Sequence, residues 1–215
     1  MSSFLGYLSS RWDNLLGLAL QHALIVVVAV LIATATGVSL GVLTYKNERA
    51  MNLTLSVTGI FLTIPSLALF GLLIPIFGLG LTPTIVALVM YALLPIVRNT
   101  VVGLRSVDPA ISESAQGMGL NGRQRLWRIE LPLAWPVILT GVRVSTVMLI
   151  AIAAVAAIVN GPGLGEDIFD GLGRIGTPNA LNLVLGGTLG IVVLSLLFDA
   201  FFVVVGRLTT SGGIR

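Results

Sequence analysis

The chain has 215 residues, of which 56% are hydrophobic and only 10% are charged, and its mean hydropathy is +1.03. Soluble domains carry roughly 25% charged residues, so this composition excludes an ordinary soluble protein. The net charge of +3 therefore does not indicate nucleic-acid binding, and the absence of cysteine excludes a disulfide framework and a thiolate site.

Several apolar segments are long enough to cross a bilayer, which takes about 20 residues. Backbone groups in lipid are satisfied only in helices or closed barrels, and these segments are too long for barrel strands. We therefore expect an all-α integral membrane protein, one domain over residues 1–215, without a cleaved signal. About five transmembrane helices are expected, at residues 20–44, 53–77, 84–103, 134–159 and 183–206. Pro65, Pro75 and Pro95 predict kinked or broken second and third helices.

The first and last spans contain features that bear on packing. His22, the only histidine, falls near the outer start of the first span and is expected to be an interfacial polar residue. Glycines four residues apart, at Gly37 and Gly41 and at Gly186 and Gly190, allow helices to approach closely.

A polar segment between the third and fourth spans is the most distinctive part of the chain. Asp108 followed by Pro109 predicts a helix start, because Asp accepts hydrogen bonds from unpaired amides and proline loses no bond there. Gly117 and Gly119 predict its end and a close approach by another backbone. The helix would have a small apolar face formed by Ile111, Ala115 and Met118. A solvated loop with ordinary helix ends is the alternative reading.

A second helix is expected directly after the first. Asn121 is a suitable N-cap, and Pro132 is expected to stop the helix. The helix would carry three arginines, Arg123, Arg125 and Arg128.

Two ionisable residues fall well inside predicted spans, at matching depths from the same boundary. Arg143 lies in the fourth span and Asp199 in the fifth, each roughly 12–14 Å deep at ~1.5 Å of rise per residue. Lone charges at such depth are costly. Either Arg143 extends to the interface while Asp199 faces a translocation path, or the two residues form an ion pair.

The loop at about 160–182 contains glycines and prolines that argue against a deep helix. Ile168, Phe169 and Leu172 predict a short amphipathic piece that lies on the membrane or against a partner. This loop is expected to be external.

The basic residues predict the orientation, because basic residues near span ends stay in the cytoplasm. With the first connection inside, only Arg11 and Arg174 fall outside, which predicts an external N-terminus and a cytoplasmic C-terminus. The residues then inside are Lys46, Arg49, Arg98, Arg105, Arg123, Arg125, Arg128, Arg207 and Arg215.

The segment ESAQGMGLNGRQRLWRIELP, residues 113–132, resembles the cytoplasmic EAA loop of ABC-importer permeases. The opening triplet corresponds to residues 113–115, with Ser114 in the place of an alanine. Gly119 corresponds to the glycine of the motif, and Ile129, Leu131 and Pro132 to its closing Ile-x-Leu-Pro. The resemblance implies a type I importer permease fold, with a coupling loop at about 104–133 that docks a separate ATPase. The implied coupling residues are Glu113, Ser114, Ala115, Gly117, Gly119, Ile129, Leu131 and Pro132.

Four further segments are similar to permeases of the osmoprotectant family, which import glycine betaine, carnitine, choline or related quaternary amines. They are TIPSLALFGLLIPIFGLG (63–80), YALLPIVRNT (91–100), VDPAISESAQGMG (107–119) and NGPGLGEDIF (160–169). The resemblance covers roughly residues 15–208.

A quaternary amine is normally held by aromatic faces, and aromatic residues are sparse in the spans. We therefore expect strong recognition on an external binding protein and a weak path through this chain. The candidate path-lining residues are Phe61, Pro65, Phe70 and Tyr91, although phenylalanines in apolar helices more often serve packing.

No ATP-binding loop is present, since the only lysine, Lys46, is followed by Asn47. ATP and magnesium are thus expected on a partner. The resemblance implies a second permease subunit, two ATPase subunits, an external binding protein, and a multi-pass location in a bacterial cytoplasmic (inner) membrane. The alternatives are an importer with amino-acid cargo such as methionine, an intramembrane lipid-modifying enzyme using Glu113, Arg123 and Arg128, or a structural scaffold.

Overall fold

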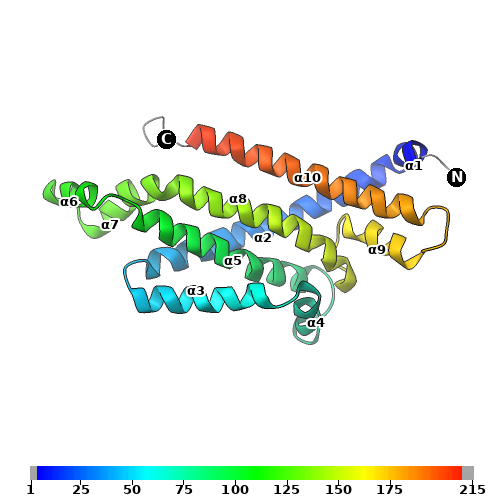
Figure 1. Cartoon of the computed structure of the whole chain (residues 1–215), viewed down its shortest axis with the longest axis horizontal. Helices are drawn as coiled ribbons and strands as arrows, with labels where there is room; N and C mark the ends of the chain where they lie inside the picture. Colours follow the sequence, from blue (N-terminus) through cyan, green and yellow to red (C-terminus); the bar gives the residue numbers. More distant parts are fainter. Residues whose placement is uncertain (1–3, 210–215) are drawn as a thin grey trace.

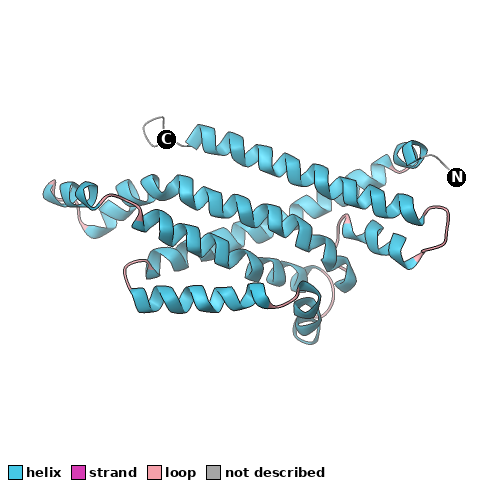
Figure 2. Cartoon of the chain, in the orientation of Figure 1, coloured by secondary structure: helices cyan, strands magenta, loops and turns pink. Residues whose placement is uncertain are grey.

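The computed structural model describes residues 4–209, which form a bundle of helices without β-strands (Figures 1 and 2). Four helical segments are long and apolar enough to cross a membrane: α2 (Trp12–Thr44), α5 (Leu81–Arg105), the segment Gly122–Val159 that contains α8 (Leu131–Val155), and α10 (Ala180–Thr209). The bent pair α3 (Glu48–Thr63) and α4 (Ser66–Phe77) gives a fifth if it is taken as one span. The prediction of an all-α membrane protein with about five spans is confirmed.

The second predicted span is broken between α3 and α4, which meet at 99° (Figure 1). Ile64 is extended, with φ −78° and ψ 125°, because a residue before proline is pushed out of the α region. Its carbonyl accepts a hydrogen bond from the Tyr91 hydroxyl at 2.7 Å. The break predicted at Pro65 is therefore present, and α5 fixes its position.

Of the kinks or breaks predicted at the other two prolines, no break is present, because α4 and α5 continue through Pro75 and Pro95. Tertiary packing supports α5 at Pro95. The Asn99 side chain donates to the Pro95 carbonyl at 2.8 Å, and a Cβ on Gly141 of α8 would lie 2.9 Å from that same carbonyl. A neighbouring helix thus packs directly on the proline-bearing turn.

Helix α5 is the centre of the bundle, with α2 on one side and α8 on the other. A Cβ at Gly41 would lie 2.6 Å from Thr100 Cγ2, and a Cβ at Gly37 would lie 2.8 Å from Ile96 Cγ2. The first pair of spaced glycines therefore forms a close crossing of α2 and α5 within the chain.

The two ends of the bundle carry different short helices (Figure 1). α6 (Pro109–Gly117) and α7 (Gly122–Arg125) lie at one end, which we call the α6 end. α1 (Phe4–Ser10), the 3₁₀ turn η2 (Ala156–Val159) and α9 (Gly165–Gly173) lie at the other, the α9 end.

The predicted amphipathic piece of the 160–182 loop is α9, and one side of it packs on α10 of the same chain. Glycines at the contact allow the two helices to approach this closely. A Cβ on Gly171 would lie 2.7 Å from the Ala180 carbonyl, and one on Gly187 would lie 2.8 Å from the Leu164 carbonyl. The second glycine pair also packs within the chain, since Gly186 faces Tyr7 and Gly190 faces Leu164.

α10 is the least covered of the long helices. Only 11% of its most apolar window is buried inside the chain, against 39–44% for the other three segments. Most of its side chains are therefore free to contact lipid or another subunit.

Candidate coupling site and membrane-embedded polar residues

Helix α6 is defined by strong signals at both ends. The Asp108 carboxylate accepts the Ala110 amide at 2.8 Å, and Pro109 occupies the first turn, as predicted. At the other end Gly119 has φ +85°, its amide bonds the Gln116 carbonyl at 2.9 Å, and the Leu120 amide bonds the Ala115 carbonyl at 3.1 Å. These paired bonds form a Schellman motif, in which glycine provides the left-handed residue. The ends of α6 are thus set by local sequence.

The surface of α6 divides into a side against the bundle and a side that is open. Ala115 is fully buried, whereas Ile111 and Met118 are 42% and 72% exposed. The three residues of the predicted apolar face therefore lie in different environments, and only Ala115 packs into the bundle. The other predicted coupling residues of this helix are exposed: Glu113, Ser114, Gly117 and Gly119. A Cβ built on Gly117 or Gly119 meets no atom within 4 Å, so another chain can approach both backbones closely.

The second helix of the loop begins where the sequence predicts. Asn121 and Gln124 form a capping box, with reciprocal side-chain to backbone bonds of 2.9 Å. The expected stop at Pro132 is wrong, because α7 runs through the π-helical turn η1 (Leu126–Glu130) into α8. The Leu131 amide bonds the Leu126 carbonyl, five residues back, and this wider turn accommodates the proline that follows. Ile129 and Leu131 are half-buried, and Pro132 is exposed.

A buried carboxylate holds α6 against the bundle. Glu130 is 6% exposed and accepts hydrogen bonds from the Ser112 hydroxyl at 3.1 Å and from the Tyr45 hydroxyl at 2.7 Å. Burial and the bond to Glu130 raise the pKa of Tyr45. Arg105 Nε donates to the Tyr45 carbonyl at 2.8 Å, and Arg125 donates to the Gln116 side chain. Sequence reasoning missed Glu130, which is the unspecified residue of Ile-x-Leu-Pro; its only signal is a carboxylate beside an apolar run.

Arg143 and Asp199 lie together. Arg143 Nε and Nη2 donate to the two carboxylate oxygens of Asp199 at 2.6 and 2.7 Å, which joins α8 to α10 with bidentate geometry. The side chains are 40% and 41% exposed in the isolated chain. Charged side chains in membranes pair or face water or protein, so this side of the pair suits an aqueous path or another subunit better than lipid.

The four candidate path-lining residues lie in two environments. Phe70 is fully buried and Tyr91 is 3% exposed, so the chain's own core encloses both side chains, and neither lines a passage in this structure. Phe61 is half-buried and Pro65 is exposed, on either side of the break between α3 and α4. Sequence reasoning placed all four in spans without knowing which faces the core would cover.

His22 is not an interfacial residue. It is fully buried, and its Nε2 lies 3.0 Å from the Ile150 carbonyl of α8. The expectation fails because α2 begins at Trp12, well before the predicted start at residue 20, which moves His22 into the bundle.

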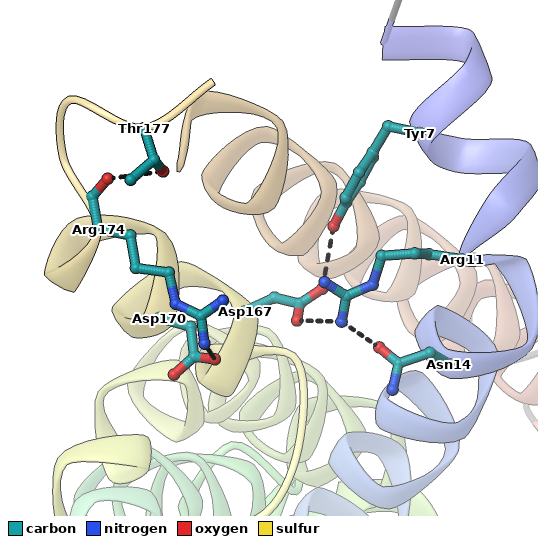
Figure 3. A network of polar contacts seen from close by, with 7 residues as sticks. All are labelled: Tyr7, Arg11, Asn14, Asp167, Asp170, Arg174 and Thr177. Atoms are coloured by element: carbon teal, nitrogen blue, oxygen red, sulfur yellow. Dashed lines mark hydrogen bonds and ion pairs between the residues drawn. The ribbon is translucent and has the colours of Figure 1, made fainter. Parts of the chain in front are cut away.

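A polar network joins α1, α2 and α9 at the α9 end (Figure 3). Asp167 is 4% exposed and accepts from the Tyr7 hydroxyl at 3.2 Å and from Arg11 Nη2 at 3.1 Å. Burial and the nearby Asp167 charge raise the pKa of Tyr7 to about 12. Burial also raises the pKa of Asp167, against the opposing effect of Arg11. A second pair, Arg174 with Asp170, lies on the exposed side of α9 at 3.2 Å.

These features define a class of protein: a multi-pass helical membrane protein that exposes a capped helix with a glycine terminus at one end of its bundle. The chain belongs to the family of binding-protein-dependent transport system inner membrane components, whose model matches residues 33–211. Members are permease subunits of ABC importers, in which a partner ATPase handles ATP. The chain is thus a transport component and not an enzyme.

Curated relatives are similar over nearly the whole chain. The carnitine transport permease protein OpuCB of Listeria monocytogenes is 37% identical over 93% of this chain and 89% of its own length. The choline transport system permease protein OpuBB of Bacillus subtilis is 34% identical over 100% and 97%. The osmoprotectant import permease protein OsmW of Salmonella typhimurium is 37% identical over 97% and 98%.

A solved structure has the same fold. The chain of the MetNI methionine ABC transporter in an inward-facing conformation aligns with a TM-score of 0.79 at 23% identity, over 92% of this chain and 96% of that one. The type I importer permease fold expected from the sequence is therefore confirmed.

Proposed function

We propose that this chain is the permease subunit of an ATP-driven importer for osmoprotectants of the quaternary-amine class, such as glycine betaine, carnitine or choline. The observation that carries the cargo class is the identity of 34–37% to relatives named for carnitine, choline and osmoprotectant transport over nearly their whole length. The MetNI likeness supports only the fold, because its identity is 23%.

The coupling residues are proposed from the surface of α6. A cleft on the ATPase would receive this helix, with Gly117 and Gly119 allowing close backbone contact and Glu113 meeting a basic or amide-rich rim. Ile111 and Met118, exposed at 42% and 72%, supply apolar area that a docked partner would cover. Burying that area favours association.

The orientation is proposed from the charges and from the ends of the bundle. The α6 end carries the arginine-rich coupling loop, at about 104–133, and we place it in the cytoplasm. The α9 end, with the loop at about 160–182, is then external, the N-terminus is out and the C-terminus in. The whole chain acts as one permease domain in a bacterial cytoplasmic membrane.

The proposed assembly has two permeases, identical or homologous, with two ATPases inside and a binding protein outside. The scarcely covered α10 and the half-exposed Arg143–Asp199 pair support a second permease or a water-filled path beside α8 and α10. ATP-driven closure of the ATPases would move the paired α6 helices and shift the population of outward-open and inward-open states.

Reconstitution tests this function. The chain is placed in liposomes with its cognate ATPase and binding protein, and uptake of labelled glycine betaine, carnitine, choline and methionine is measured. We expect ATP-dependent uptake of a quaternary amine and no ATP hydrolysis by the chain alone, since it lacks a phosphate-binding loop. Uptake of methionine in place of quaternary amines would support the amino-acid alternative.

A further inference from the structure

Glu130 stands where three elements meet: the end of α2, helix α6 and the base of α8. It is the last residue of η1, and its two carboxylate oxygens accept from different elements, Oε1 from Ser112 on α6 and Oε2 from Tyr45 at the end of α2. One side chain thus connects the helix proposed to meet the ATPase with a helix that crosses the membrane.

The two hydroxyls are the hydrogen-bond donors that replace the hydration of this buried carboxylate. The ion pairs among residues 4–209 are those of Asp167, Asp199 and Asp170, and Glu130 is in none of them. A buried carboxylate is tolerated when hydrogen bonds replace its hydration. These bonds are short-range and directional, so displacing Ser112 or Tyr45 leaves the charge under-solvated and favours movement of the other partner with it.

The local backbone suits such a movement. η1 is a π-helical turn, and π turns interrupt the regular α ladder and occur often at functional positions. A groove of about 390 Å³, lined by residues that include Val42, Trp127 and Leu131, lies between α2 and the start of α8. Space is therefore available for η1 to shift relative to α2 without opening the packed core.

We propose that Glu130 is a positioning residue that transmits displacement of α6 to α2, through Ser112 on one side and Tyr45 on the other. The inference rests on the proposed function, and it adds a route to the first membrane span that the α6 surface alone does not provide. Contacts of α8 with α5 would carry movement to the other spans.

The test uses the reconstituted complex with ATPase and binding protein. The readout is solute taken up per ATP hydrolysed, measured with the amount of assembled complex and its thermal unfolding temperature. The variants are Ser112→Ala, Tyr45→Phe, the double variant and Glu130→Gln. Thr36→Ala is the matched control, because its hydroxyl bonds only carbonyls of its own helix, those of Ile32 at 2.8 Å and Ala33 at 3.2 Å, and it lies outside the groove.

We expect Ser112→Ala and Tyr45→Phe each to lower the uptake-to-hydrolysis ratio by about tenfold, the effect of losing one hydrogen bond to a charged group. Because they act in series, the double variant should lose no more than the stronger single. Glu130→Gln should retain most coupling, since its amide can accept from Tyr45 and donate to Ser112. Thr36→Ala should match the wild type.

An unchanged ratio in Ser112→Ala or Tyr45→Phe would overturn the inference. So would a double variant that loses the product of the two single effects, because independent contacts would then be at work. Reduced assembly with a normal ratio would likewise mean a purely structural role. A wild-type complex that hydrolyses ATP without moving any quaternary amine would instead overturn the proposed function.

Discussion

Substituting Gly119 with Asp separates docking of α6 from folding of the chain. The residue has φ +85°, where an ordinary side chain costs about 1–2 kcal/mol, and Asp is among the residues that tolerate this region best. A new Cβ meets nothing within 4 Å inside the chain, so no steric cost is added. Against a typical stability of about 5–15 kcal/mol, the variant should stay folded and inserted.

Binding of the ATPase to α6 should be weakened much more than folding of the chain. If the ATPase covers Gly119, the new carboxylate loses its hydration without gaining a partner, at a cost of at least about 3 kcal/mol, which is more than a hundredfold in affinity. The assay compares membrane abundance, co-purification of the ATPase and solute uptake for the wild type, Gly119→Asp and Gly119→Asn. Asn tolerates the same backbone conformation but carries no charge, and it should lose less.

Normal uptake in Gly119→Asp would refute the docking surface. Loss of both variants from the membrane would refute the argument that strain at this position is small. The informative result is a chain that is present, folded and not bound by its ATPase.

Four further predictions follow from packing and charge. Gly41→Ala should destabilise the chain by about 1–3 kcal/mol, because the new Cβ would overpack against Thr100. Gly17→Ala in the same helix should stabilise it by about 0.5–1 kcal/mol, because a Cβ there meets nothing within 4 Å. Equal unfolding temperatures of the two variants in detergent would contradict both expectations. Arg143→Gln and Asp199→Asn should each destabilise the subunit, and the charge-swapped double variant should recover part of the loss; strictly additive losses would mean that the two residues act independently. Burial raises the pKa of Asp167 above its unfolded value, so the folded chain binds this proton more tightly. The resulting contribution to the free energy of unfolding is fully present at low pH and is lost as pH rises through the raised pKa. Asp167→Asn should flatten the dependence of unfolding temperature on pH in that range, and an unchanged profile would exclude Asp167 as its source. A reporter fused after Arg215 should be cytoplasmic, and an external signal would reverse the proposed orientation.

Local signals in the sequence were sufficient for the parts of the coupling loop that depend on neighbouring residues. Asp108 and Asn121 cap the helices as predicted because a capping bond spans only two or three residues. The end of α6 at Gly119 was equally predictable from the sequence, since glycine readily adopts a backbone conformation that few other residues adopt.

Prolines were predicted less well, because their effect depends on what lies beside them. Pro65 marks a break, whereas Pro95 sits in a continuous helix on which α8 packs at Gly141, and Pro132 follows a π turn. No pattern within the segment distinguishes these cases. Tertiary contacts decide them.

Long-range partners explain the remaining differences. Glu130 and Tyr45 are 85 positions apart, and nothing in either neighbourhood indicates their contact. His22 was placed at the interface because the predicted start of α2 was too late. The burial of Phe70 and Tyr91 could not be predicted, because it depends on how the helices are arranged. The Arg143–Asp199 contact was one of two open readings, since depth alone does not give helix rotation.

Helix α2 is anchored at each end by a buried carboxylate from a distant part of the chain. Asp167 receives Arg11 at the first end, and Glu130 receives Tyr45 at the second, about 50 Å away along a helix rising 1.5 Å per residue. Inserting or deleting one residue between them would rotate one anchor by about 100° relative to the other, so both contacts could not form at once. The length of this helix is therefore constrained. Substitutions on its exposed side keep the spacing between the two contacts, whereas a change of even one residue in length does not.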